Sequence, residues 1–282
     1  MKVLEDWHTH HKRCRHAEGM IEDYIKSALD SGVTSIGVSD HFPYEFLNDL
    51  DRIPHEEYGM SLTEITSYLD DINTLQKKYG EKITIRAGFE IDFLLNQEHL
   101  LNKQLDKFKE KLDYILGSVH ILEGDRGKWS FDDSRFLQEY KDIGVDQVYL
   151  AYYETLQKMI LSDSFDFDIV SHFDLPKKFN LFPKQKETVQ NEAFETLELI
   201  KENEKVMEIN TGGLRKEVKQ QYPSKRIIEE MFSLGIPVLL GSDAHHPSEV
   251  AFEFGQMKSM LKEIGYNRLA HFENRTMHFV DL

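Results

Sequence analysis

Short apolar, β-branched segments alternate along the chain with longer segments of helical period, and this alternation constrains the fold more than any other feature. It recurs seven times with no break in composition and no linker. Strands that alternate with helices predict a mostly parallel sheet covered by helices. We therefore expect an α/β fold in which residues 1–282 form a single domain, a closed or nearly closed β/α barrel. An open doubly wound sheet is the alternative.

The alternation places seven strands and seven helices. The expected strands are Val3–His8, Thr34–Asp40, Ile83–Phe89, Asp113–Val119, Phe167–Ser171, Val206–Asn210 and Pro237–Gly241. The expected helices are Met20–Asp30, Leu62–Tyr79, Gln97–Lys111, Gln147–Leu161, Gln185–Glu202, Ser224–Ser233 and Pro247–Ile264. Two insertions, Phe42–Ser61 and Ile121–Gly144, interrupt the rhythm, and loops of this length in compact domains often cover a binding site.

Composition disfavours several classes of protein. The chain has 34 Lys and Arg residues against 50 Asp and Glu residues, and a formal charge of −16 disfavours binding to a nucleic-acid backbone. No apolar run approaches the roughly 20 residues that span a bilayer, and the first residues lack the apolar core of a signal peptide. The single cysteine, Cys14, allows no intrachain disulfide. We expect a cytoplasmic protein without a membrane or nucleic-acid partner.

Metal-ligand side chains stand where the expected strands end. Ligands of β/α folds bind at the carboxyl ends of the strands, and six of the seven strands finish in a histidine, a carboxylate or both. Side chains at positions i and i+2 point the same way, so His8 and His10 converge, as do Asp243 and His245. Imidazole and carboxylate donors suit Zn, Mn or Fe(II). The candidate ligands are His8, His10, His16, His41, Glu90, His120, His172, Asp243 and His245.

Nine candidates exceed the three or four ligands that one catalytic zinc takes, so two or three ions are expected. Glu90 can bridge two of them, because a carboxylate has two oxygens. The thiolate of Cys14, which lies between candidate ligands, is a less favoured alternative. The other histidines are expected outside the ligand set, with His11 and His246 at its rim and His55, His99, His271 and His278 on the surface.

Basic residues follow two of the strand ends. Lys177 and Lys178 follow the fifth strand, and Arg215 follows the sixth. Arginine binds phosphate bidentately, whereas lysine acts as a point charge. A multi-metal site with few carboxylates is strongly positive and suits a phosphate dianion, although each of these residues is alternatively an ordinary solvated cation. The sequence contains neither a Gly-x-Ser-x-Gly motif nor a P-loop.

Seven segments between residues 8 and 247 occur in a specific order. They are HTHHKRCRHAEG, SDHFP, AGFEIDF, GSVH, SHFDLPKKF, EINTGGLRK (followed by YPS) and GSDAHHP. Their combination resembles the polymerase-and-histidinol-phosphatase (PHP) superfamily and, within it, the histidinol-phosphatase branch. Amidohydrolases share the HxH element, but they usually carry a metal-bridging lysine where this chain has Glu90.

The resemblance implies a distorted seven-stranded (β/α)7 TIM-like barrel that holds three divalent transition-metal ions, Zn, Fe or Mn. It implies catalytic roles for Glu90, Asp243 and Arg215, and substrate binding by Arg215 and Lys177. The implied ligand sets are His8, His10, Glu90 and Asp243 for the first ion, Glu90, His120 and His172 for the second, and His16, His41 and His245 for the third.

The activity that the resemblance implies is hydrolysis of a phosphate monoester, above all L-histidinol phosphate of histidine biosynthesis. A metal-bridging hydroxide would attack phosphorus, because coordination lowers the pKa of water to about 7. Asp40, Asp174 and His246 are the candidates for protonating the leaving group. Three alternatives remain: a PHP-type phosphodiesterase or nuclease, a phosphatase for another small monoester, and a non-catalytic metal-binding barrel.

Overall fold

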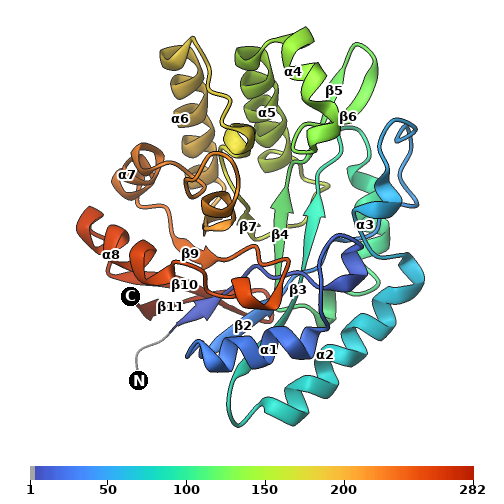
Figure 1. Ribbon diagram of the computed structural model, residues 1–282, viewed down its shortest axis with the longest axis vertical. Coiled ribbons are helices and arrows are strands. Elements are labelled where there is room, and N and C mark those ends of the chain that lie inside the picture. Colours follow the sequence, from blue (N-terminus) through green and yellow to red (C-terminus); the bar gives the residue numbers. More distant parts are fainter. Residues whose placement is uncertain (1–3) are drawn as a thin grey trace.

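The computed structural model describes residues 4–282, so Val3 of the first expected strand lies outside the described residues. Seven strands form one parallel sheet in which each strand hydrogen-bonds to the next along the chain (Figure 1). They are β1 (Glu5–Asp6), β2 (Ser35–Val38), β3 (Thr84–Asp92), β4 (Tyr114–Ser118), β7 (Ile169–Val170), β8 (Val206–Asn210) and β9 (Val238–Gly241).

The sheet curls until its first and last strands meet. The N–H of Trp7 donates to the carbonyl of Leu240 at 3.0 Å, and the N–H of His10 donates to that of Ala244 at 2.9 Å. Thr9 and Ala244 form an isolated parallel bridge on the same seam. The expected β/α barrel is therefore confirmed in a nearly closed form, and the open doubly wound alternative is wrong.

Helices cover the outside of the barrel, and each buries one stripe of apolar side chains (Figure 1). They are α1 (Ile21–Asp30), α2 (Ile65–Tyr79), α3 (Glu98–Leu105), α5 (Val145–Ile160), α6 (Lys186–Glu202), α7 (Lys225–Leu234) and α8 (Phe254–Ile264). In α2 the buried side chains recur at the three- and four-residue spacing of one helical face. Within residues 4–282, the structure has no helix with the length and apolarity needed to traverse a bilayer.

Two of the expected helices are shorter than the pattern predicts. The helix expected at Gln97–Lys111 ends at Leu105. In the segment Pro247–Ile264, Ala251 and Glu253 each have a φ of 55°, in the left-handed region that a right-handed helix cannot include. The helix therefore begins only at Phe254, although the apolar pattern continues through the preceding residues. The pattern of side chains alone does not reveal this change in backbone conformation.

Two antiparallel hairpins lie outside the predicted alternation. β5 (Ile121–Gly124) and β6 (Gly127–Ser130) form the first, within the insertion after β4, and α4 (Leu137–Ile143) follows them. β10 (Arg268–Glu273) and β11 (Thr276–Asp281) form the second, near the end of the chain. Both hairpins consist of short strands with many polar residues, which give little periodic signal.

The second hairpin covers the end of the barrel where the strands begin. Phe272 of β10 belongs to a buried cluster with Trp7 and Tyr114, whose rings meet edge to face with centroids 5.1 Å apart. The Tyr114 hydroxyl donates to the carbonyl of Trp7 at 2.7 Å. Gly88 leaves room for this ring, because a Cβ there would lie 2.6 Å from it. With this end filled by apolar side chains, the polar residues gather at the opposite end.

Candidate metal centre

The nine predicted ligands lie together around the carboxyl ends of the strands. Within residues 4–282, donor atoms lying within 4.8 Å of one another form five overlapping groups of three. The groups are His8, His10 and Asp243; Glu90, His120 and His172; His16, His41 and His245; His10, His41 and Glu90; and His10, Cys14 and His245. The first three groups together contain all nine side chains, and they match the three sets that the sequence resemblance implies, except that Glu90 is missing from the group of His8, His10 and Asp243.

Glu90 stands at the centre of this arrangement, near the end of β3, and is 2% exposed. Its Oε1 lies 2.7 Å from His172 Nε2 and 3.6 Å from His120 Nε2. Its Oε2 lies 3.0 Å from His8 Nε2 and 3.3 Å from His10 Nε2. Each carboxylate oxygen therefore faces a different group of imidazoles, which is the geometry of a ligand shared between two cations.

The nitrogen and oxygen atoms around Glu90 are arranged as ligands that could bind cations. His8 Nε2 and His10 Nε2 lie 2.9 Å apart, while the Nδ1 atom of each ring faces a different carboxylate. If both rings carry their protons on Nδ1, the two Nε2 lone pairs face each other and Glu90. His41 Nδ1 is buried without a hydrogen-bond partner, 3.4 Å from Glu90 Oε2. Positive ions between these atoms would satisfy all of them at once.

Buried carboxylates behind the imidazoles hold their orientation. Glu208 Oε1 lies 2.7 Å from His8 Nδ1, and Asp92 Oδ1 lies 2.7 Å from His120 Nδ1. A carboxylate that accepts the Nδ1–H of a histidine turns the Nε2 lone pair toward a metal and increases its basicity. Gly241 makes room for Glu208, because a Cβ there would lie 1.8 Å from Glu208 Oε1. Sequence reasoning missed Glu208, although alternation along β8 was a signal that could have found it.

Burial and neighbouring charges set the protonation of the site. Burial raises the pKa of Glu90 and of Asp243, but the facing histidines outweigh it and hold both pKa values well below their usual range. Burial lowers the pKa of His10, yet hydrogen bonds to Asp243, Asp40 and Glu90 reverse this and raise it to about 10. Burial lowers the pKa of His41 well below its usual value, with the charge of His10 adding to the effect. The carboxylates are therefore ready to bind cations, whereas rings such as His10 must first lose a proton.

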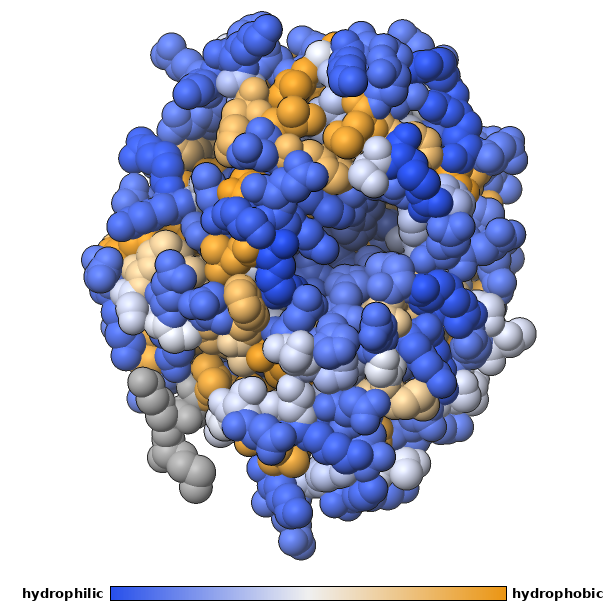
Figure 2. All heavy atoms as spheres, in the orientation of Figure 1, coloured by the Kyte–Doolittle hydropathy of each residue, from blue (hydrophilic) through white to orange (hydrophobic). Residues whose placement is uncertain are grey.

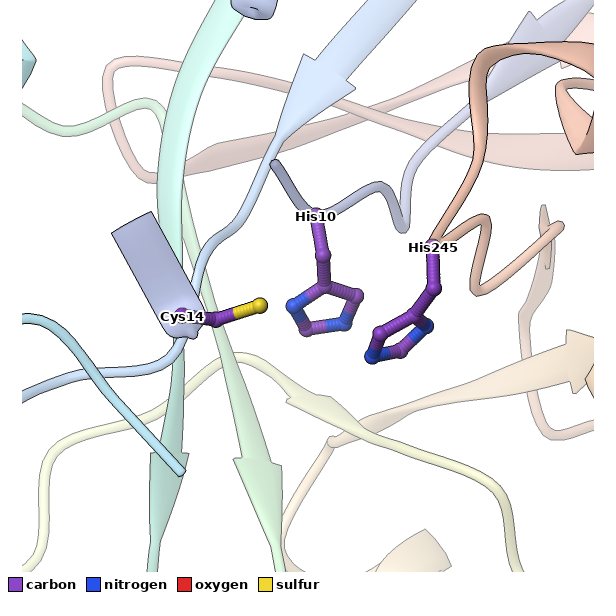
Figure 3. Close-up of side chains that lie close together, drawn as sticks. All are labelled: His10, Cys14 and His245. Atoms are coloured by element: carbon purple, nitrogen blue, oxygen red, sulfur yellow. The ribbon is translucent and has the colours of Figure 1, made fainter. Parts of the chain in front are cut away.

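Cys14 also reaches the centre. Figure 3 shows its sulfur directed at the ring of His10, with the ring of His245 on the other side, and the two rings stack with centroids 4.2 Å apart. Burial raises the pKa of the thiol, and the charge of Asp40 raises it further. A thiol must be deprotonated to bind a metal, so the environment of Cys14 opposes thiolate ligation.

The ligands open into a cavity of about 470 Å³. On the face in Figure 2, hydrophilic residues surround a hollow near the centre of the molecule. Both insertions contribute to the cavity wall: residues 42–61 supply Tyr44, Glu57 and Tyr58, and residues 121–144 supply further polar side chains. Seven of the nine candidate ligands line the cavity, all except His8 and His10. Besides these ligands and the three residues named above, the lining consists of Arg15, Ser130, Asp132, Asp133, Arg135, Leu175, Lys178, Lys216 and Tyr222.

Lys177, predicted to bind substrate, lies behind the cavity wall. It is 2% exposed, and its Nζ donates to Asp174 Oδ2 at 2.9 Å and to the carbonyl of Gln221 at 2.8 Å. The next residue, Lys178, lines the cavity and donates to Asp132 Oδ2 at 2.9 Å. One position along this loop therefore separates a buried cation from one that faces the ligands.

Arg215 lies beneath the cavity wall, against the backbone that carries Asp243. Its Nη2 donates to the carbonyls of Ser242 and Asp243 at 2.8 and 2.9 Å, and its Nε lies 3.2 Å from Glu249. Its Nη1 is buried and has no hydrogen-bond partner within the described residues. Arg215 therefore braces a candidate ligand while one of its nitrogens keeps donor capacity.

The remaining polar candidates are held at the rim or outside it. His11 Nδ1 lies 2.5 Å from Asp40 Oδ2, behind His10. His246 is exposed and accepts a hydrogen bond from the N–H of Ser248 at the start of a short turn. Among the candidate proton donors, Asp40 is thus paired with His11, and Asp174 is paired with Lys177. His55, His99, His271 and His278 are absent from the metal groups and from the cavity lining.

A nearly closed β/α barrel with histidines and carboxylates gathered around a shared glutamate at its strand ends has the architecture of a metal-dependent hydrolase. The PHP domain family model matches residues 6–212, and the chain belongs to the PHP family.

Known relatives resemble this chain over nearly its whole length. It is 33% identical over 278 residues to the probable histidinol-phosphatase of Deinococcus radiodurans, covering 98% of this chain and 99% of that one. It is 28% identical to the histidinol-phosphatase of Bacillus subtilis, covering 88% and 96% of the two chains. The histidinol phosphate phosphatase of Lactococcus lactis, solved with Zn, L-histidinol and phosphate, has a TM-score of 0.76 at 20% identity over 98% of both chains. That likeness shows the shared fold.

Proposed function

We propose that this protein is a metal-dependent phosphate monoester hydrolase that converts L-histidinol phosphate to histidinol and phosphate in histidine biosynthesis. The observation that carries the proposal is Glu90, whose two oxygens face separate groups of imidazoles at the open end of the barrel. Similarity to curated histidinol-phosphatases over nearly the whole chain supports the choice of substrate. A cytoplasmic location is part of the proposal, and the single buried Cys14 fits it.

Three divalent ions of Zn, Fe or Mn fit the donor set, because it combines neutral imidazoles with a few carboxylates. When bound, such ions supply an acidified water and neutralise phosphoryl charge. His8, His10, Glu90 and Asp243 would hold the first, Glu90, His120 and His172 the second, and His16, His41 and His245 the third.

The chain's own residues hold the centre in shape. Glu208 and Asp92 fix the rings of His8 and His120, and Arg215 fixes the backbone at Asp243. The buried Nη1 of Arg215 has no protein partner within the described residues, but Arg215 does not line the cavity, so its role in phosphate binding stays a prediction from the sequence. Lys177 adds positive charge behind the wall, where Asp174 partly offsets it.

The size of the cavity favours a small ester over a nucleic acid. Sequence-independent binding of single strands uses a basic groove with exposed aromatic residues, and the chain carries a formal charge of −16. A cavity of about 470 Å³ lies within the usual range for small-molecule sites. The nuclease alternative therefore receives less support than the monoesterase.

The test compares substrates on one metal-loaded preparation. Elemental analysis follows loading with Zn, Mn or Fe, and turnover is then measured with L-histidinol phosphate, other small phosphate monoesters and a short oligonucleotide. We expect transition metal in the protein and the highest kcat/KM for L-histidinol phosphate. Preference for another monoester would revise the substrate, preference for the oligonucleotide would favour the nuclease, and inactivity toward all of them would favour a non-catalytic barrel.

A further inference from the structure

The loop between β8 and α7 (residues 211–224) presents polar groups that the protein leaves unpaired beside the metal centre. The ammonium of Lys216 forms no hydrogen bond or ion pair within residues 4–282, and the residue lines the cavity. Tyr222 lines the same cavity and is 1% exposed, and its hydroxyl has no partner among the described residues. Buried polar groups in proteins are normally paired, so the unpaired hydroxyl points to a ligand.

Tyr222 is held firmly in this position. Its N–H and carbonyl exchange hydrogen bonds with Asn210, at the end of β8, at 2.8 and 2.7 Å. The backbone of Gly213 packs on its ring, because a Cβ there would lie 2.8 Å from the ring carbon that bears the hydroxyl. Lys177 Nζ lies 5.3 Å from the ring centroid. Neighbours thus fix the ring while the hydroxyl remains without a protein acceptor.

Among the described residues that line the cavity, Lys216 is the cation without an ion pair, and it is exposed to solvent. Lys178, by contrast, is paired with Asp132 at 2.9 Å. Although the residue is exposed, partial desolvation by the surrounding atoms lowers the pKa of Lys216, and the charge of Lys178 lowers it further. An anion beside Lys216 would relieve both effects.

We propose that Lys216 and Tyr222 bind the phosphoryl group of the substrate, each donating a hydrogen bond to a phosphoryl oxygen. This inference rests on the proposed function, because it requires a phosphate monoester in the cavity. The ammonium selects the phosphoryl end of the substrate, since the histidinol portion carries an amine that a second cation would repel. The β8–α7 loop therefore orients the ester so that phosphorus lies toward the metal centre and the organic group lies toward the insertions.

The test separates binding of the two products. Lys216→Gln and Tyr222→Phe are measured in zinc-loaded protein for kcat/KM and for inhibition by inorganic phosphate and, separately, by L-histidinol. We expect phosphate inhibition to weaken by about 10- to 100-fold in each variant, since each loses one hydrogen bond to a charged group. Inhibition by L-histidinol should change by less than about 2-fold, because no phosphoryl oxygen is present.

Matched variants control for the substitutions themselves. Lys219→Gln removes a cation from the same loop outside the cavity lining, and Tyr149→Phe removes a hydroxyl that donates to the carbonyl of Leu181 at 2.8 Å. Both should retain wild-type phosphate inhibition. Unchanged phosphate inhibition in both test variants, or equal weakening for both products, would overturn the inference. Calorimetric binding of phosphate to the zinc-loaded proteins gives the same comparison even if the wild type hydrolyses no monoester, an outcome that would refute the proposed function alone.

Discussion

Glu90 accepts contacts on both of its oxygens, and this division decides how the residue can be tested. Ser118 donates to Oε1 at 2.6 Å, on the side of His172, while His8 and His10 face Oε2. Glutamine keeps the shape of the side chain but replaces one acceptor oxygen with a donor and removes the negative charge. Whichever way the amide turned, one group of imidazoles would face an N–H.

We therefore predict that Glu90→Gln lowers kcat by at least about 100- to 1,000-fold while the barrel stays folded. Bound metal should also decrease, because a shared anionic ligand is lost. Steady-state kinetics, elemental analysis and circular dichroism of the same preparation measure these effects. Turnover near that of the wild type would rule out Glu90 as the shared ligand.

At the scale of single residues, the sequence predicted the candidate ligands better than the residues that hold those ligands in place. His8, Glu90 and Asp243 follow from strand ends and from the two-residue period, which local sequence encodes. Alternation along β8 could have indicated that Glu208 points inward, but it could not have identified the partner, because His8 lies 200 positions away along the chain. Lys177 and Lys178 differ only in how a short loop turns, and sequence does not specify that turn.

Among the secondary-structure elements, the hairpin formed by β10 and β11 has a stabilising role that strand–helix alternation does not predict. Arg275, in its turn, places Nε 2.5 Å from Asp168 Oδ2 and Nη2 2.8 Å from Asp166 Oδ1. Asp168 also accepts the N–H of Ile115 at the start of β4. These contacts fasten the hairpin to the end of the barrel opposite the metal centre.

We predict that Arg275→Ala lowers the free energy of unfolding by about 1–3 kcal/mol, because Asp168 loses its cation in a largely buried position. The side chain of Arg275 is 20% exposed, which keeps the effect below that of a fully buried pair. Denaturant unfolding at fixed metal concentration measures it. The control is Arg268→Ala, whose guanidinium covers the exposed ring of Phe279 and should matter by less than about 1 kcal/mol. A large loss of turnover in Arg275→Ala with unchanged stability would contradict this assignment.

For the molecule as a whole, metal loading and protonation compete. Burial lowers the pKa of His10 and of His120, but the carboxylates facing them raise both to about 10. Both folded pKa values exceed the ordinary value of 6.5, so the charged rings stabilise the metal-free fold fully below about pH 6.5. That contribution is lost as the pH rises through about 10.

Zinc binding at pH 7 is accordingly predicted to release protons, and the apparent affinity should increase as the pH rises toward 10. Calorimetric titrations in buffers of different ionisation enthalpy measure the number of protons released. Binding heats that do not depend on the buffer at pH 7 would show that His10 and His120 are already neutral in the metal-free protein.

The whole-molecule architecture was predictable because each strand and helix has its own period, and seven alternations leave few topologies. The contact between the first and last strands, which closes the barrel, was harder to predict, because it depends on single hydrogen bonds such as that between Trp7 and Leu240. The two hairpins and the walls of the cavity depend on contacts between distant segments, which periodicity does not report.

The overlap of the donor groups has a practical consequence for dissecting the centre. His10 is common to three of the five groups found within residues 4–282, whereas His16, His120 and His172 are each private to one. Replacing a donor that several groups share would disturb several ions together, so a loss of activity in that variant could not be assigned to one ion. Replacing a donor that belongs to one group only would remove one ion at a time. Such donors are therefore the first residues to substitute when the ions are assigned to their ligands.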